Sequence, residues 1–174
     1  MITSEDGATK NIFLDVSRAR HYAAAVHRAF CDVPLPHPPF VRDPRAEDLK
    51  ILRLLEGQAW WVLPPVVLYV WRVDFSVLDV EPYVYFLPAF LVQSVLADEY
   101  DLSAWTFNRL IPPSEGEVGS RFMNMAASFN AEQCQLILLF ARDFLEVNWH
   151  VAESADNRAA RTLEFWTSRS DALK

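Results

Sequence analysis

Ten consecutive residues near the middle of the chain, Tyr83 to Val92, include no charged or strongly polar side chain. A helix that is apolar on every side cannot face water, so such a run belongs in the interior of a protein. A fully buried strand could contain the same run. The surrounding segment, Phe75–Ala97, is long for a strand and contains residues typical of helix starts. We therefore predict a buried helix near Val80–Ala97 and expect the rest of the chain to pack around it.

The start of this helix is marked more clearly than its middle. Asp79 suits the N-cap, Glu81 suits the positive end of the helix dipole, and Pro82 suits the first turn. Pro88 is the exception, because a proline in a helix interior removes a hydrogen bond and crowds the preceding turn, at a cost of roughly 3 kcal/mol. We expect a kink or a break at Leu87–Pro88.

A second buried helix is predicted over Ala131–Val147. Asn130 and Gln133 form a capping-box pattern at its start, and Leu136–Ala141 is apolar on all sides. The chain has only 4 glycines in 174 residues, which argues against a fold rich in β-hairpins. We predict an all-α protein, a single compact domain of about six to eight helices around the two buried ones. This domain is expected over residues 12–170, after a disordered lead-in over residues 1–11.

A proline-rich stretch, Asp32–Pro44, interrupts the helical pattern. It contains five prolines, which exclude a helix and favour an extended crossover. We expect Leu35, Phe40 and Val41 to anchor this crossover on the domain. Further on, a short buried helix is predicted for residues 65–72; a strand is the alternative, because β-branched and aromatic residues dominate there.

The net charge of −7 comes from one part of the sequence. Residues 73–120 hold eight acids and one base, Arg109, whereas residues 1–72 hold 8 acids and 9 bases, and residues 121–174 hold 7 acids and 6 bases. Nucleic-acid binding needs clustered lysine and arginine, so it is disfavoured. Five of the acids are candidates for a face that binds a basic protein: Asp98, Glu99, Asp101, Glu115 and Glu117. Plain solubilisation by surface acids is an equally good interpretation.

Aromatic residues are concentrated between Trp60 and Phe90, where there are nine. A core packed with rings is the simpler interpretation, since the flanking residues are aliphatic. The alternative is a ligand pocket whose tyrosines and tryptophans combine apolar walls with polar tips. The residues proposed for that pocket are Trp60, Trp61, Trp71, Tyr83 and Tyr85.

No local signature of an enzyme occurs in the sequence, which favours a non-enzymatic protein without excluding an enzyme. The four histidines have no ligand spacing, so no metal site, cofactor or catalytic residue is predicted. Cys31 and Cys134 are interpreted as reduced thiols. The uncharged stretch Gly57–Trp71 is too short to span a membrane, and the polar N-terminus is unlike a signal peptide. We expect a cytoplasmic protein; its oligomeric state is not predicted.

Several segments together resemble a bacterial family of small, functionally uncharacterised proteins. They are AFCDVPLP (29–36), Trp61 before Pro64, VLDVEPYVYFLPAFL (77–91), FNAEQCQLILLF (129–140) and AARTLEFW (159–166). The most specific piece is FLPAFL, residues 86–91; the family's usual Pro-Glu order appears here reversed, as Glu81-Pro82. The resemblance implies a cytoplasmic bacterial protein. It implies no particular activity, because the family has none that can be carried over.

Two functions follow from these observations. The leading hypothesis is a protein-binding module, such as an inhibitor or immunity protein, that offers its acidic face to a basic partner. The alternative is a small-molecule-binding protein or enzyme that uses the aromatic-lined pocket.

Overall fold

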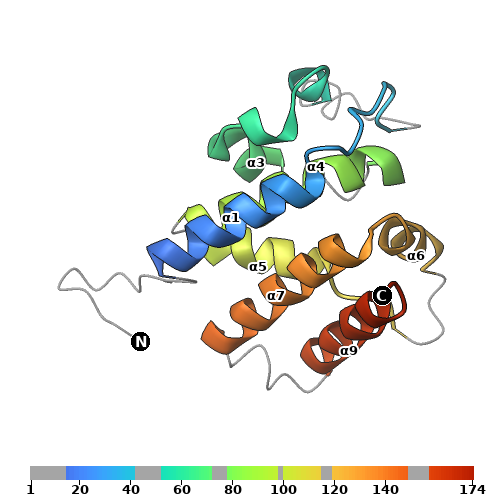
Figure 1. Ribbon diagram of the computed structural model, residues 1–174. Helices are drawn as coiled ribbons and strands as arrows, with labels where there is room; N and C mark the ends of the chain where they lie inside the picture. Colours follow the sequence, from blue (N-terminus) through green and yellow to red (C-terminus); the bar gives the residue numbers. More distant parts are fainter. Residues whose placement is uncertain (1–14, 42–51, 72–77, 98–99, 115–118, 149–156) are drawn as a thin grey trace.

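The computed structural model describes residues 15–41, 52–71, 78–97, 100–114, 119–148 and 157–174. In these ranges the chain forms helices and no strand, which confirms the predicted all-α domain (Figure 1). The predicted lead-in over residues 1–11 lies outside them. The elements with both ends defined are α1 (Val16–Phe30), η1 (Trp60–Val62), α3 (Pro65–Trp71), α4 (Val80–Leu96), α5 (Tyr100–Arg109), α6 (Ser120–Ala127), α7 (Ala131–Val147) and α9 (Arg158–Asp171).

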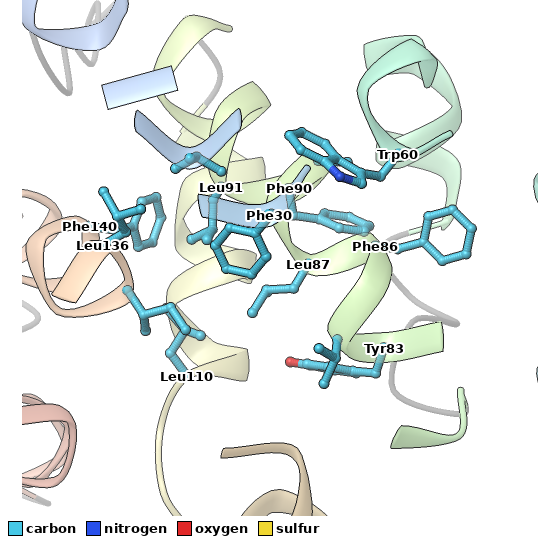
Figure 2. Close-up of a cluster of buried hydrophobic side chains, with 14 of the residues drawn as sticks. Phe30, Trp60, Tyr83, Phe86, Leu87, Phe90, Leu91, Leu110, Leu136 and Phe140 are labelled. Carbon is cyan, nitrogen blue, oxygen red and sulfur yellow. The ribbon is translucent and has the colours of Figure 1, made fainter. Parts of the chain in front are cut away.

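Helix α4 is the centre of the molecule, as its apolar run predicts. Every residue from Pro82 to Leu91 is buried, so the helix is enclosed on all sides. It packs against α1, α5, α6, η1 and α3. Figure 2 shows its side chains among residues from neighbouring elements: Phe30, Trp60, Leu110, Leu136 and Phe140. The prediction of a buried central helix is confirmed.

The predictions for the start and for the middle of α4 have different outcomes. Asp79 is the N-cap residue, as expected, but its side chain makes no capping hydrogen bond. Its backbone N–H donates instead to the Phe40 carbonyl at 2.8 Å, which ties the start of α4 to the crossover. The helix continues through Pro88 without interruption, so a break at Leu87–Pro88 is wrong. A bend at that position stays a prediction.

Helix α7 begins with the predicted capping box. The Asn130 side chain accepts from the Gln133 backbone N–H at 2.9 Å, and the Gln133 side chain accepts from the Asn130 N–H at 3.1 Å. The Gln133 amide also donates to the Ala29 carbonyl at 2.8 Å, near the end of α1. Helices α7 and α9 lie side by side, in orange and red in Figure 1. The second predicted centre is therefore confirmed.

The crossover is described as far as residue 41 and is not helical. Phe40 and Val41 are buried, and the Phe40 ring lies 5.9 Å from that of Phe86 on α4. Leu35 is 41% exposed, so its predicted role as an anchor is wrong.

The segment after Pro64 is a helix, α3, and the strand alternative is wrong. The prediction that this helix is buried is also wrong for most of its described side chains. Leu68 points into the core, while Val66 is 66% exposed and Val70 58% exposed. Helix α3 covers α4 from outside (Figure 1), so one apolar residue per turn suffices for its packing.

Candidate functional site

The predicted acidic face lies almost entirely outside the described residues. Asp98 and Glu99 fall in the gap between α4 and α5, and Glu115 and Glu117 fall in the gap before α6. Asp101 belongs to the first turn of α5, but its side chain is outside the description. The grouping of these five residues therefore stays a prediction.

The predicted aromatic residues divide into two groups. The rings of Trp60 and Trp61 lie 5.6 Å apart, and His27 of α1 lies 5.6 Å from the first and 5.5 Å from the second. Tyr85 belongs to this group through a backbone hydrogen bond from Trp60, which lowers a tyrosine pKa that burial raises. Trp60 and Tyr85 are both only 2% exposed, whereas Trp61 is 48% exposed, so this cluster lies partly in the core and partly at the surface. Tyr83 lies elsewhere, and the Trp71 side chain is outside the description.

Tyr83 lines a pocket of about 300 Å³ between α4, α5 and α6. That volume is at the lower end of the range for small-molecule sites, about 300–1,000 Å³. The lining residues are Val80, Tyr83, Asn108, Arg109, Ile111, Arg121, Phe122 and Met125. Half of them are apolar and half carry hydrogen-bonding groups, so the pocket offers both apolar surface and polar contacts to a ligand.

Helical spacing explains why these residues meet. Val80 and Tyr83 are three apart at the start of α4, so they lie on one face. Phe122 and Met125 have the same spacing at the start of α6. The Phe122 ring also lies 5.3 Å from the Phe165 ring on α9, which holds α6 against that helix. The last turn of α5 closes the third side of the pocket.

Arg109 is held in place from two directions. Its guanidinium lies 4.9 Å from the centre of the Trp105 ring, one turn earlier on α5. A cation over an indole face is attracted by the ring's negative charge density. Its backbone carbonyl accepts from the Tyr83 hydroxyl at 3.4 Å, and Figure 2 shows this hydroxyl directed towards the side of Leu110. The pairing links the start of α4 to the end of α5.

Burial raises the pKa of Tyr83 far above its ordinary value, because the phenolate would lose its hydration. The positive charges of Arg109 and Arg121 act in the opposite direction and lower it. Since burial has the larger effect, Tyr83 is a neutral phenol at physiological pH. Both guanidinium groups are close enough to act on its hydroxyl, so the pocket combines two cations with a neutral donor.

Arg121 is exposed by surface area, but its guanidinium lies close enough to the protein for partial burial to lower its pKa. Tyr83, when its phenol is ionised, and the Asp79 carboxylate raise that pKa, and the like charge of Arg109 lowers it. The two arginines therefore repel each other across the pocket, and Asp79 offsets part of that repulsion. An arginine stays protonated even so.

Gly119 fixes where α6 begins. A Cβ atom at this position would lie 2.2 Å from Cγ of Pro113, so no other residue fits without a shift of the proline ring. Gly119 is the N-cap residue of α6, and no side chain in the described ranges caps the helix at that end. The close approach of Gly119 to Pro113 thus positions Arg121, two residues later.

Sequence reasoning identified one residue of this pocket, Tyr83, and missed its charged groups. Arg109 carries a signal that could have found it, because it is the one base among eight acids in residues 73–120. Arg121 follows directly after that segment. Among the described residues, no group of three or more His, Cys, Asp or Glu side chains could hold a metal ion. None of the helices in the described ranges has the length and hydropathy needed to cross a bilayer.

Comparisons with known proteins place the chain in a family. No curated protein and no solved structure matches it. A family model described as a family of unknown function, DUF6714, matches residues 40–170, which is well over half of the chain. The chain belongs to DUF6714, a family of unknown function.

Proposed function

We propose that this protein binds a small molecule in the pocket between α4, α5 and α6. The observation that supports this most directly is that Tyr83, Arg109 and Arg121 all line one hollow of about 300 Å³. Small-molecule sites are typically concave and largely apolar, with a few polar groups that converge on the ligand. The pocket has that form, and we assign binding and no reaction to it.

A test begins with the thermal stability of the purified protein in a panel of small metabolites. A ligand that binds only the folded state stabilises it by about 2.7 kcal/mol at a concentration of 100 Kd. The decisive variant is Asn108→Trp, because Asn108 lines the pocket with an exposed side chain, and an indole there would fill the volume. We expect it to abolish the ligand-induced rise in midpoint.

Asn124→Trp is the matched control. Asn124 is exposed on α6 and does not line the pocket, so the same change of side chain leaves the volume open. A ligand that stabilises the Asn108→Trp variant as well as the wild type binds elsewhere, and would remove this pocket from consideration.

A second proposal follows from the uneven charge. We infer that the acidic residues around α5 bind a basic protein, as an inhibitor or immunity protein would. This proposal is supported by the composition of residues 73–120, which contain eight acids and one base. Helix α4 ends at Leu96 and α5 begins at Tyr100, so three of the five acids fall at that junction. Acidic rims of this kind mainly raise the rate of association with a basic partner.

The test is capture of a partner from the source cell, followed by association rates at two ionic strengths. Neutralising Asp98, Glu99 and Asp101 to Asn, Gln and Asn should slow association, and more so at low salt. A captured partner that binds the neutralised variant equally fast at both salt concentrations would leave these acids as ordinary solubilising surface. As part of both proposals we place the protein in the bacterial cytoplasm, where thiols such as the exposed Cys31 stay reduced.

A further inference from the structure

The pocket has two cationic groups in its lining. Among the described residues that line it, Arg109 and Arg121 are charged and none is acidic. Asp79 is a carboxylate whose charge acts on Arg121. The presence of two guanidinium groups at one pocket stands out because the protein as a whole carries −7.

The backbone of α6 adds to the same field. The first turn of this helix supplies Arg121 and Phe122 to the pocket. Helix N-termini present backbone N–H groups and the positive end of the helix dipole, both of which favour anions. Gly119 offers no side-chain oxygen to satisfy these groups, and no side chain of the described residues caps the helix. A bound anion would serve that role together with the two arginines.

Other residues of the same lining are apolar. They are Ile111, Phe122 and Met125, with Val80 from α4. Burial of the body of a ligand against these side chains would contribute about 25 cal/mol for each Å² of apolar surface removed from water. The pocket therefore combines anion-binding groups with apolar side chains, within a volume suited to a small ligand.

We propose that the ligand of this pocket is a small amphipathic oxyanion, a carboxylate or phosphate group joined to an apolar or aromatic body. The planar guanidinium matches both kinds of oxyanion with paired hydrogen bonds. Asn108 adds a neutral hydrogen-bonding group that orients the ligand. This inference rests on the proposed small-molecule function and names its ligand class.

The experiment measures the affinity of the intact protein for four probes by calorimetry at constant ionic strength. Phenylacetate and phenyl phosphate carry the two oxyanions on the same ring, phenylacetamide is the neutral counterpart of phenylacetate, and inorganic phosphate lacks the apolar body. We expect at least one of the two aromatic anions to bind at least tenfold more tightly than both phenylacetamide and inorganic phosphate. The tighter of the two then identifies the oxyanion.

Three substitutions with equal effect on net charge test the role of the arginines. Arg109→Gln and Arg121→Gln should each weaken binding of the preferred anion at least tenfold. Arg142→Gln on α7 should leave it within twofold, because Arg142 is exposed and does not line the pocket. Arg109→Lys, which keeps the charge over Trp105, should bind more tightly than Arg109→Gln, and this variant guards against a loss of structure.

The outcomes separate the ligand class from the proposed function. If phenylacetamide binds as tightly as phenylacetate and phenyl phosphate, or if Arg142→Gln weakens binding as much as the pocket variants, the oxyanion class is overturned. The same holds if none of the four probes binds at millimolar concentration. In each case the proposed function is judged separately, by whether Asn108→Trp abolishes stabilisation by any neutral metabolite. If Arg109→Gln is the one variant that fails to fold, its unfolding midpoint will show this. The affinities of Arg121→Gln and Arg109→Lys for the preferred anion then decide the question.

Discussion

The guanidinium of Arg18 on α1 lies 2.5 Å from the carboxylate of Asp143 on α7. The two partners differ in exposure, because the Asp143 side chain is 5% exposed and the Arg18 side chain 50%. Burial raises the pKa of Asp143 above its ordinary value, Arg18 lowers it, and Glu146 raises it. The ion pair therefore joins α1 to α7 through Asp143, a carboxylate that is costly to ionise because it is buried.

The first prediction concerns the pH dependence of this pair. Native Asp143 holds its proton to a higher pH than the unfolded chain, where the ordinary value is about 3.9. Stability therefore falls as the pH rises from that value through the raised native pKa. Arg18→Gln removes the group that lowers this pKa, so it should deepen the fall and cost on the order of 1–2 kcal/mol at pH 7, less than for a fully buried pair.

Urea unfolding of Arg18→Gln at pH 4 and pH 7 checks this prediction. The loss should be greater at pH 7, where Asp143 is ionised and unpaired. Asp143→Asn should cost less at pH 7 than Arg18→Gln, because the half-exposed guanidinium that it leaves behind is solvated. Arg20→Gln, on the exposed side of α1, is the control for the change in net charge. Equal losses for Arg18→Gln at both pH values would contradict the assignment.

The second prediction compares two buried tryptophans. Trp166 of α9 donates its indole N–H to the Leu110 carbonyl at 2.8 Å, whereas the indole N–H of Trp60 is buried without an acceptor in the described part of the chain. Trp166→Phe and Trp60→Phe remove the same atoms. Only the first also leaves a buried carbonyl without its donor, so it should cost about 1–3 kcal/mol more. Thermal unfolding should show a lower midpoint for Trp166→Phe; the reverse order would mean that Trp60 has an acceptor.

The third prediction concerns Pro88, buried in the middle of α4. Pro88→Ala regains a backbone hydrogen bond, but it removes ring atoms from a core that packs α4 on all sides. We expect the two effects to nearly cancel, although a proline within a helix costs roughly 3 kcal/mol when packing is ignored. Unfolding midpoints of the two proteins decide this. A rise of several degrees for the alanine variant would show that α4 is not adapted to the proline.

The sequence predicts α4 and α7 well because the evidence for both is local. An apolar run within a segment that is long for a strand, with helix-start residues before it, predicts a buried helix without knowledge of its neighbours. The capping box of Asn130 and Gln133 is local in the same sense, since both of its hydrogen bonds join residues three apart. These elements could be predicted before the structure was known.

The pocket could not be predicted in this way. Its walls come from the start of α4, the end of α5 and the start of α6, and their meeting depends on how the three helices pack. Tyr83 and Tyr85 look alike in the sequence, yet two residues along a helix separate them by more than half a turn. One therefore lines the pocket, while the other joins the cluster of Trp60 and Trp61. The burial of α3 was misjudged for a related reason, because an apolar composition does not tell how many sides of a helix are covered.

The last prediction uses two glycines to test how the pocket is positioned. Gly57→Ala and Gly119→Ala both add a Cβ atom, and both should destabilise the protein. Gly57 has a φ of 71° with open space around it, so alanine there costs about 1–2 kcal/mol through the left-handed backbone alone. At Gly119 the cost arises from the contact with Pro113, which requires the proline ring or the start of α6 to shift, and a shift of α6 moves Arg121 and Phe122 with it. We therefore expect Gly119→Ala to weaken binding of the preferred aromatic anion at least tenfold, and Gly57→Ala to leave it unchanged at a temperature where both variants are folded. Calorimetry, with circular dichroism to confirm folding, makes the comparison. Equal affinities for the two variants would show that the pocket tolerates movement of α6, and that the contact between Gly119 and Pro113 serves stability alone.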